Sequence, residues 1–242
     1  MIAEEIHKIT AQLPDGVRLV AVSKYHPVEA ILEAYAAGQR IFGESHAQEL
    51  QRKHEALSVT VLEGSSVSSS RAPEGSHEGS PDSLAWHFIG HLQTNKVKYI
   101  APYVSLIHSG DSPRLLAEIN KQALRAGRVI PCLLQLHVAE EETKFGFTPD
   151  EALAYLDGGE WQQLAGLQLA GVMAMATNTD DAARIRSDFH RARLFFEKAQ
   201  SFFSPSTFNE LSMGMSDDWH IAIDEGSTLI RIGTQIFGQR QY

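Results

Sequence analysis

Short apolar runs alternate with longer amphipathic segments along the whole chain. Runs such as 18–23 (RLVAVS) have the length and composition of buried strands, whereas 27–37 repeats apolar residues at helical spacing. Strands are expected at 18–23, 40–42, 85–89, 104–108, 131–138, 167–173, 208–211 and 229–232. Helices are expected at 27–37, 45–57, 93–100, 113–126, 181–203 and 216–224, and also from 148 and from 234 onward.

These units predict an α/β fold, a single (β/α)8 TIM-like barrel that occupies residues 1–242 as one domain. An open, doubly wound sheet is the alternative. Two helix starts carry clear capping signals, because Ser112 precedes Pro113 and Thr148 precedes Pro149.

One segment, 64–83 (GSSVSSSRAPEGSHEGSPDS), departs from this pattern. It holds eight Ser, three Gly and two Pro in twenty residues. Such a composition buries too little apolar surface to offset its ordering entropy. We expect a mobile surface insertion without a role in the core; a regulatory or partner-binding loop is the alternative.

The charge of the chain excludes several classes of partner. With 21 Lys+Arg against 30 Asp+Glu, the formal net charge is −9, which argues against nucleic acid or an anionic membrane as the main partner. The acidic start MIAEEIHK lacks the apolar region of a signal peptide, and no run approaches 18 apolar residues. We therefore expect a cytoplasmic protein, and we expect it to be a monomer.

The cysteine content excludes a Cys-based metal cluster and an internal disulfide. Cys132 is the only cysteine, and it lies in the apolar run 129–138, where a buried core thiol is expected. No metal site is predicted.

Lys24 is the first candidate for chemistry. It ends the apolar strand AVSK, and in a barrel such a lysine points into the mouth, where the active sites of this fold lie. A desolvated lysine amine attacks carbonyl groups. The simpler interpretation is a strand-end lysine that extends its amine to solvent.

Two loops near the C-terminus indicate a phosphate site. The loops after strands seven and eight often bind phosphate in such barrels, and here they contain Ser216 and the pair Gly233-Thr234. Ser216 and Thr234 are expected N-caps of short helices, whose free N–H groups attract anions. Plain capping is the alternative. Nearby Arg231 is either a permanent charge at the site or one half of an ordinary ion pair.

A lysine on one side of the mouth and a phosphate site on the other suggest a phosphorylated aldehyde. Pyridoxal 5'-phosphate (PLP) has both groups that such a site would need.

Five motifs carry a specific resemblance. AVSK (21–24), FGES (42–45), WHFIGHLQTNK (86–96), LSMGMSDD (211–218) and RIGTQIFG (231–238) together resemble the pyridoxal-phosphate homeostasis protein family, which is similar to the N-terminal barrel domain of alanine racemases. The resemblance implies a fold-type III PLP barrel without the C-terminal β domain.

The resemblance also implies roles for single residues. PLP would form a Schiff base on Lys24, with phosphate contacts from Ser216, Gly233 and Thr234 and with Arg231 opposite the pyridine nitrogen. An arginine there leaves the ring unprotonated and a poorer electron sink. One departure concerns Ser45, where the family usually has Asn, so a ring contact from this position is left open.

Three functions remain to be compared. The first is intracellular PLP homeostasis by holding, buffering or delivering the cofactor, with PLP-dependent apo-enzymes as possible recipients. The second is a PLP-dependent racemase, and the third is a regulatory module that keeps the cofactor as a sensing group. Racemisation needs a base on each face of the α-carbon. The residues near the mouth that could supply the second base are Tyr25, His26, His46 and His87, and no motif assigns one of them, so no catalytic residue is predicted.

Further polar residues are left without a role at this point. His87 could face the cofactor ring or lie in the core, and His91 follows the same strand. Lys144 and Gly146 resemble a family motif. The helix 181–203 carries five basic residues, which usually indicate a solvated face and less often a nucleic-acid or partner site. They are Arg184, Arg186, Arg191, Arg193 and Lys198.

Overall fold

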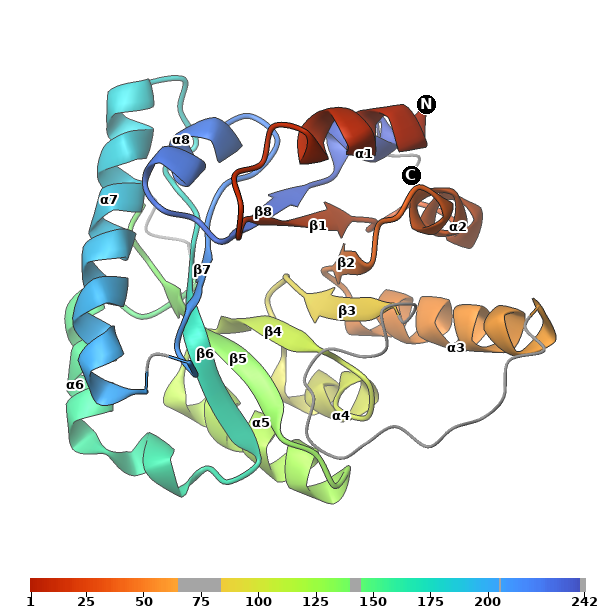
Figure 1. The fold of residues 1–242 in the computed structure, drawn as a ribbon. Helices are drawn as coiled ribbons and strands as arrows, with labels where there is room; N and C mark the ends of the chain where they lie inside the picture. Colours follow the sequence, from red (N-terminus) through yellow and green to blue (C-terminus); the bar gives the residue numbers. More distant parts are fainter. Residues whose placement is uncertain (65–83, 140–144, 205, 240–242) are drawn as a thin grey trace.

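A closed barrel of parallel strands forms the centre of the molecule. The computed structural model describes residues 1–64, 84–139, 145–204 and 206–239. Within them, β1 to β8 pair in chain order and β8 returns to pair with β1 (Figure 1). The predicted (β/α)8 barrel is confirmed, and the alternative of an open doubly wound sheet is wrong.

The strands are short and lie close to their predicted positions. They are β1 (Arg18–Val22), β2 (Ile41–Glu44), β3 (Ala85–Phe88), β4 (Leu106–Gly110), β5 (Ile130–Leu136), β6 (Leu167–Ala174), β7 (Glu210–Ser212) and β8 (Leu229–Ile232). The main differences are in β4 and β7, which each begin two residues later than expected and end at Gly110 and Ser212.

Helices follow the strands and cover the outside of the barrel (Figure 1). They are α2 (Val28–Ala36), α3 (Ala47–Gly64), α4 (Val97–Ile100), α5 (Pro113–Arg125), α6 (Pro149–Gly158), α7 (Ala182–Ala199), α8 (Trp219–Asp224) and α9 (Thr234–Phe237). An additional helix, α1 (Ile2–Thr10), precedes β1 and packs on α2 and α9. We did not predict α1; its signal is the pair of buried residues Ile6 and Ile9 on one face.

The predicted capping signals at two helices are confirmed. The Ser112 hydroxyl accepts the Leu115 N–H at the start of α5. At α6, Thr148 forms a reciprocal capping box with Glu151. The predicted insertion at 64–83 lies outside the described residues, apart from Gly64, which ends α3.

The barrel has two distinct apolar regions. The larger one fills the space between strands and helices and includes Phe42, Phe88 and Phe189. A second cluster does not merge with it and consists of Val20, Leu106, Leu133, Ala170, Met173 and Leu229. Because alternate strand residues point to opposite faces, this second cluster fills the barrel interior. Cys132 is fully buried in the larger region, as predicted.

Candidate cofactor-binding site

A cavity of about 150 Å³ at the carboxyl ends of the strands contains all five predicted binding residues. The residues around it are Val22, Lys24, His26, Ser45, Ile89, Met175, Met215, Ser216, Arg231, Gly233 and Thr234. The sequence positions of this set span β1 to α9, so only the closed barrel brings them together. We call this cavity the inner cavity.

A larger cavity of about 660 Å³ adjoins the inner cavity. The two share Lys24, Ser45, Ile89 and Met175. The larger one extends past Tyr25 and Lys96. Lys24 therefore borders both spaces, with the inner cavity on the side of β8 and the larger cavity on the side of β3.

Lys24 is placed by a tight turn at the end of β1. The Ser23 N–H donates to the Gly43 carbonyl on β2, and the His26 N–H donates back to the Ser23 carbonyl at 3.1 Å. Tyr25, between them, has a φ of 67°. The chain thus reverses direction immediately after Lys24, whose side chain is half-buried at the mouth.

The loops after β7 and β8 also line the inner cavity, through Met215, Ser216, Gly233 and Thr234. The Arg231 N–H donates to the Gly214 carbonyl at 3.0 Å and joins β8 to the loop after β7. Gly233 approaches β1 closely, since an added Cβ would lie 3.0 Å from the Val22 carbonyl oxygen. The structure records no partner for the Ser216 or Thr234 hydroxyl within the described part of the chain.

The predicted N-caps in these loops are wrong by one or two residues. The N-cap position of α8 is Asp218, two residues after Ser216, and its carboxylate accepts the Met215 N–H at 2.5 Å. Thr234 is the first residue of α9, and Gly233 holds the cap position. Desolvation raises the pKa of Asp218. Neither Asp217 nor Asp218 lines either cavity.

Arg231 is fixed inside the barrel. It is 5% exposed, its Nη1 donates to Ser212 Oγ at 2.5 Å, and its Nη2 donates to the Ala174 carbonyl at 3.2 Å. Burial lowers the pKa of Arg231 to about 10, with the charge of Asp218 opposing this, so the guanidinium stays protonated at neutral pH. Among the described residues Arg231 forms no ion pair, which argues against the ordinary ion pair considered above.

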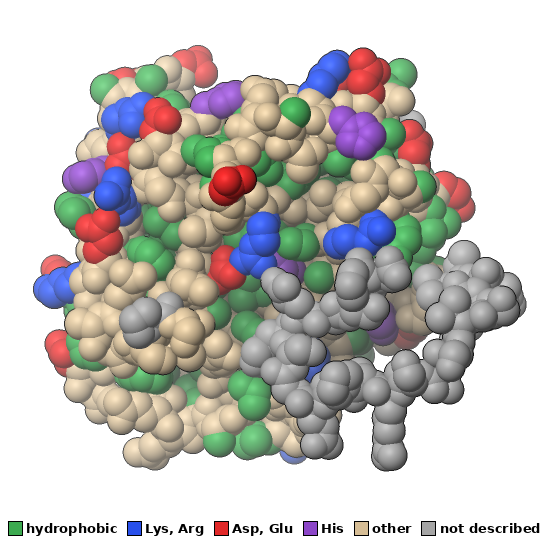
Figure 2. All heavy atoms as spheres, in the orientation of Figure 1, with side chains coloured by type: hydrophobic (Ala, Val, Ile, Leu, Met, Phe, Trp, Pro, Cys, Tyr) green, Lys and Arg blue, Asp and Glu red, His purple; other side chains and the backbone are tan. Residues whose placement is uncertain are grey.

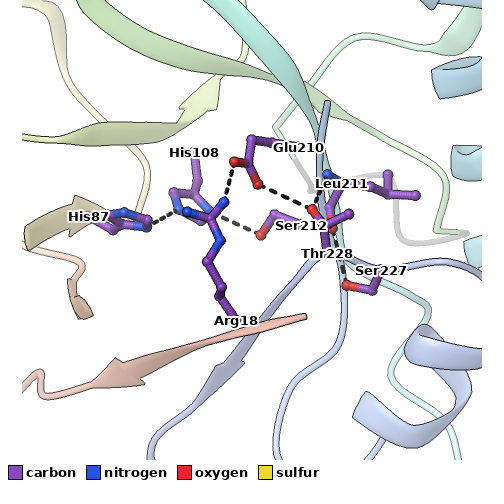
Figure 3. Close-up of polar contacts among 8 residues, drawn as sticks. All are labelled: Arg18, His87, His108, Glu210, Leu211, Ser212, Ser227 and Thr228. Atoms are coloured by element: carbon purple, nitrogen blue, oxygen red, sulfur yellow. Dashed lines mark hydrogen bonds and ion pairs between the residues drawn. The ribbon is translucent and has the colours of Figure 1, made fainter. Parts of the chain in front are cut away.

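A buried hydrogen-bonded chain continues across the barrel from Ser212, the partner of Arg231, through His108 to His87 (Figure 3). His108 Nδ1 lies 3.0 Å from Ser212 Oγ, and its Nε2 lies 2.9 Å from His87 Nδ1. Because an arginine only donates, Ser212 accepts from Arg231 and its own O–H is left for His108 Nδ1. His108 then carries its proton on Nε2 and donates to His87.

Burial keeps both histidines neutral. Desolvation, aided by the charge of Arg18, lowers the pKa of His87 to about 3. Desolvation and then the neighbouring His87, Arg231 and Arg18 lower the pKa of His108 well below its usual value. Below them in the barrel, Arg18 forms an ion pair with Glu210 (Figure 3). His87 lines neither cavity, so the core interpretation of this residue is the correct one.

Several other candidates have simpler structural roles. His91 Nδ1 lies 3.0 Å from Asp111 Oδ2, and the His91 ring stacks on Phe145 with 3.7 Å between the ring centroids. Both His91 and Phe145 line the larger cavity. Gly146 has a φ of 130° and packs against β5, while Lys144 lies outside the described residues. Ser45 borders both cavities and packs tightly on Gly90.

The arginines of α7 are paired with acidic residues. Arg184 contacts Asp188, Arg193 contacts Glu197, and Arg186 joins α7 to α8 through Asp224 and Glu225. Figure 2 shows both signs of charge interspersed along the edge of the molecule that α7 forms. This is a solvated, ion-paired helix face rather than a basic patch.

Two absences concern the part of the chain that the structure describes. No group of three or more His, Cys, Asp or Glu side chains there is arranged to hold a metal ion. No helix in this part of the protein combines the length and apolar character needed to cross a bilayer.

Comparison with known proteins identifies the family. The model of the alanine racemase N-terminal domain matches residues 1–241. A pyridoxal phosphate homeostasis protein of Aquifex aeolicus is 35% identical over 225 residues, which cover 93% of this chain and 88% of that protein. The chain belongs to the pyridoxal phosphate homeostasis protein family. The human protein of the same name is 34% identical over 231 residues, 93% of this chain and 77% of its own length.

Solved structures of relatives agree with this assignment. PipY of Synechococcus elongatus, without PLP, has 38% identity and a TM-score of 0.84, covering 98% of this chain and 100% of that one. PipY with PLP bound has 37% identity and a TM-score of 0.81, with the same coverage. An alanine racemase of Clostridium difficile shares the fold at 12% identity and a TM-score of 0.69, and this chain covers 56% of it. The predicted family and fold are confirmed.

Proposed function

We propose that this chain binds PLP in the inner cavity and serves in the homeostasis of that cofactor. The observation that carries the proposal is that Lys24 lines one cavity together with Ser216, Gly233, Thr234 and Arg231. The cavity thus combines an amine with several hydrogen-bond donors for an anion, and a phosphorylated aldehyde needs both. The family assignment and the PLP bound in PipY support the same ligand.

Each residue has a defined part in this proposal. Lys24 supplies the amine that holds the aldehyde as a Schiff base. Ser216 and Thr234 offer hydroxyl donors, and the close approach of Gly233 to β1 leaves its backbone open to the phosphate. Arg231, fixed by Ser212 and Ala174, would contact the ring nitrogen, as the family resemblance implies. When bound, the cofactor supplies an electrophilic carbon and an electron-accepting ring.

We further propose that the chain is a carrier rather than a racemase. Arg231 only donates hydrogen bonds and keeps its protons, so it disfavours a protonated ring and the carbanion that racemisation requires. Of the candidate second bases, His87 is buried in the barrel, whereas His26 lines the inner cavity but is stacked on Phe237. Tyr25 and His46 remain beside the larger cavity, and the centroids of their rings lie 5.4 Å apart. We propose PLP-dependent apo-enzymes as recipients of the cofactor.

The test of the binding site is reduction of the PLP-loaded protein with borohydride, followed by peptide mapping. Wild type should carry the reduced adduct on Lys24, and Lys24→Ala should lose both the adduct and the visible absorption band. The matched control is Lys96→Ala, which removes a lysine that lines only the larger cavity. An adduct that persists in Lys24→Ala would contradict the assignment.

Carrier and racemase functions are separated by a second pair of assays. Solvent deuterium incorporation at the α-carbon of L-alanine should stay far below about 1 per second, the lower end of ordinary enzyme turnover. An apo-enzyme mixed with the loaded protein should regain activity. Exchange with inversion at ordinary turnover would establish the racemase instead.

The oligomeric state is a separate question. We propose that the protein is a monomer, and light scattering of the purified protein would test this.

A further inference from the structure

The turn that carries Lys24 is held in an unfavourable backbone conformation. Tyr25 is the only non-glycine residue with positive φ in the described part of the chain, at 67°. For an L-residue this left-handed conformation is costly, and a large side chain rarely adopts it. Burial does not explain it, because Tyr25 is 38% exposed. Other contacts must therefore hold the turn.

Glu49, on α3, holds the residue after Lys24. Its Oε1 accepts the Tyr25 N–H at 2.7 Å. Burial alone would raise the pKa of Glu49, but the hydrogen bonds from Lys53 and Tyr25 and the positive charge of Lys53 together lower it. The carboxylate is thus charged at neutral pH, and its bond to the Tyr25 N–H is charge-assisted.

Lys53, one turn further along α3, holds the residue before Lys24. Its Nζ donates to the Ser23 carbonyl at 2.8 Å, to Glu49 Oε1 at 2.7 Å and to Glu44 Oε1 at 2.8 Å. An ammonium group has three N–H donors, so these three acceptors use all of them. The Lys53 side chain is only 8% exposed, so these bonds are shielded from water.

Glu44 completes the group at the end of β2. It is fully buried, and its Oε1 also accepts the Ser23 hydroxyl at 2.7 Å. Desolvation raises its pKa against the opposing charge of Lys53, and its Oε2 has no hydrogen-bond partner. Buried ion groups of this kind contribute little net stability compared with apolar packing. Their contacts converge on Ser23 and Tyr25, the two neighbours of Lys24.

We propose that Lys53 and Glu49 are positioning residues for Lys24. They hold Ser23 and Tyr25 and so keep the strained turn closed, which fixes the direction in which the Lys24 amine enters the two cavities. Neither touches the cofactor site: Lys53 and Glu49 line neither cavity. This inference rests on the proposed function, in which Lys24 is the lysine that binds the cofactor.

The test uses Glu49→Ala in the full-length, PLP-loaded protein. This variant removes the hold on Tyr25 but leaves the Lys53 bonds to Glu44 and to the Ser23 carbonyl in place, so the fold should persist. We expect the rate at which the variant loses PLP to a trapping apo-enzyme to be at least about tenfold higher than that of wild type. This is the size of effect expected when a hydrogen bond to a charged group is lost. The pH midpoint of the visible absorption band should also shift. The matched control is Glu55→Ala, which removes an exposed glutamate of the same helix.

A second substitution distinguishes positioning from general stability. Glycine adopts positive φ without penalty, so Tyr25→Gly should keep the turn closed without Glu49. The double variant Tyr25→Gly/Glu49→Ala should recover most of the wild-type retention, whereas a general loss of stability would not be rescued. Glu49→Gln, which keeps an acceptor for the Tyr25 N–H, should lie between wild type and Glu49→Ala.

The outcomes separate this proposal from the proposed function. If peptide mapping finds the wild-type adduct on a residue other than Lys24, the proposed function fails. If the adduct is on Lys24 but Glu49→Ala matches wild type in cofactor loss and in its absorption titration, only the positioning role is refuted. A defect in Glu49→Ala that Tyr25→Gly leaves unchanged also refutes it.

Discussion

Acidification should destabilise the protein through the two histidines inside the barrel. His87 and His108 are neutral in the fold because burial depresses their pKa, to about 3 for His87 and well below the usual value for His108. In the unfolded chain they titrate near 6.5. Between these values unfolding takes up a proton at each histidine, so the free energy of unfolding falls as the pH falls below about 6.5.

The size of this loss of stability is set by the pKa of the histidine in the unfolded chain. At pH 5 the folded His87 is still neutral, so its protonation in the unfolded chain lowers the free energy of unfolding by about 1.4 kcal/mol for every pH unit below 6.5, or about 2 kcal/mol relative to pH 7.5. This is a substantial part of a typical stability of about 5–15 kcal/mol, and His108, whose pKa burial also lowers, acts in the same direction. Protonation of carboxylates adds to this mainly at lower pH.

The assay is urea unfolding of the apo protein between pH 5 and pH 7.5. His87→Asn places an amide oxygen where His87 Nδ1 accepts from His108, and it cannot be protonated. Its stability should be less sensitive to pH than wild type by about 2 kcal/mol over this range. The control is His7→Gln, which removes an exposed histidine of α1. An identical pH dependence in His87→Asn and wild type would refute a neutral, buried His87.

Three further predictions concern single positions. Thr234→Val removes a hydroxyl donor at the inner cavity and should weaken PLP binding by about 1–3 kcal/mol while leaving pyridoxal binding unchanged, as titration with both compounds would show. Gly171→Ala should prevent soluble expression or lower the melting temperature sharply, because its Cβ would lie 1.8 Å from the Glu210 carbonyl oxygen where β6 meets β7. Cys132 should resist a thiol-reactive dye until the protein unfolds, since burial raises the pKa of its thiol and shields it.

The barrel, and the fact that the candidate binding residues line one cavity, could be predicted because strand periodicity carries the information. Arg18, Val20, Val22 and Lys24 share one parity along β1, and a strand-end lysine of that parity must reach the mouth of a closed barrel. The loops after β7 and β8 follow from the same count of strands. The helix α1 was missed because it precedes the first strand and lies outside the repeating unit.

The residues around the site were not predicted, because their contacts cross long stretches of sequence. His108 and Ser212 are 104 positions apart, and only barrel closure brings them together. Glu49 and Lys53 give no signal in the sequence for a different reason: an acidic and a basic residue four positions apart on a helix usually form an exposed pair. Here the turn after β1 covers them. A glutamate at the end of the apolar strand IFGE was the one available signal that a buried cation lay nearby.

The error in the predicted caps bears directly on the phosphate site. If Ser216 capped α8, its hydroxyl would be used by the first turn of the helix, and a ligand would have to compete for it. In the structure Asp218 occupies the cap position and bonds the Met215 N–H, so that loop is ordered without Ser216. The hydroxyl is therefore left at the wall of the inner cavity beside Gly233 and Thr234. An N-cap at Asp218 is therefore more compatible with the proposed contact between Ser216 and phosphate than the predicted N-cap at Ser216.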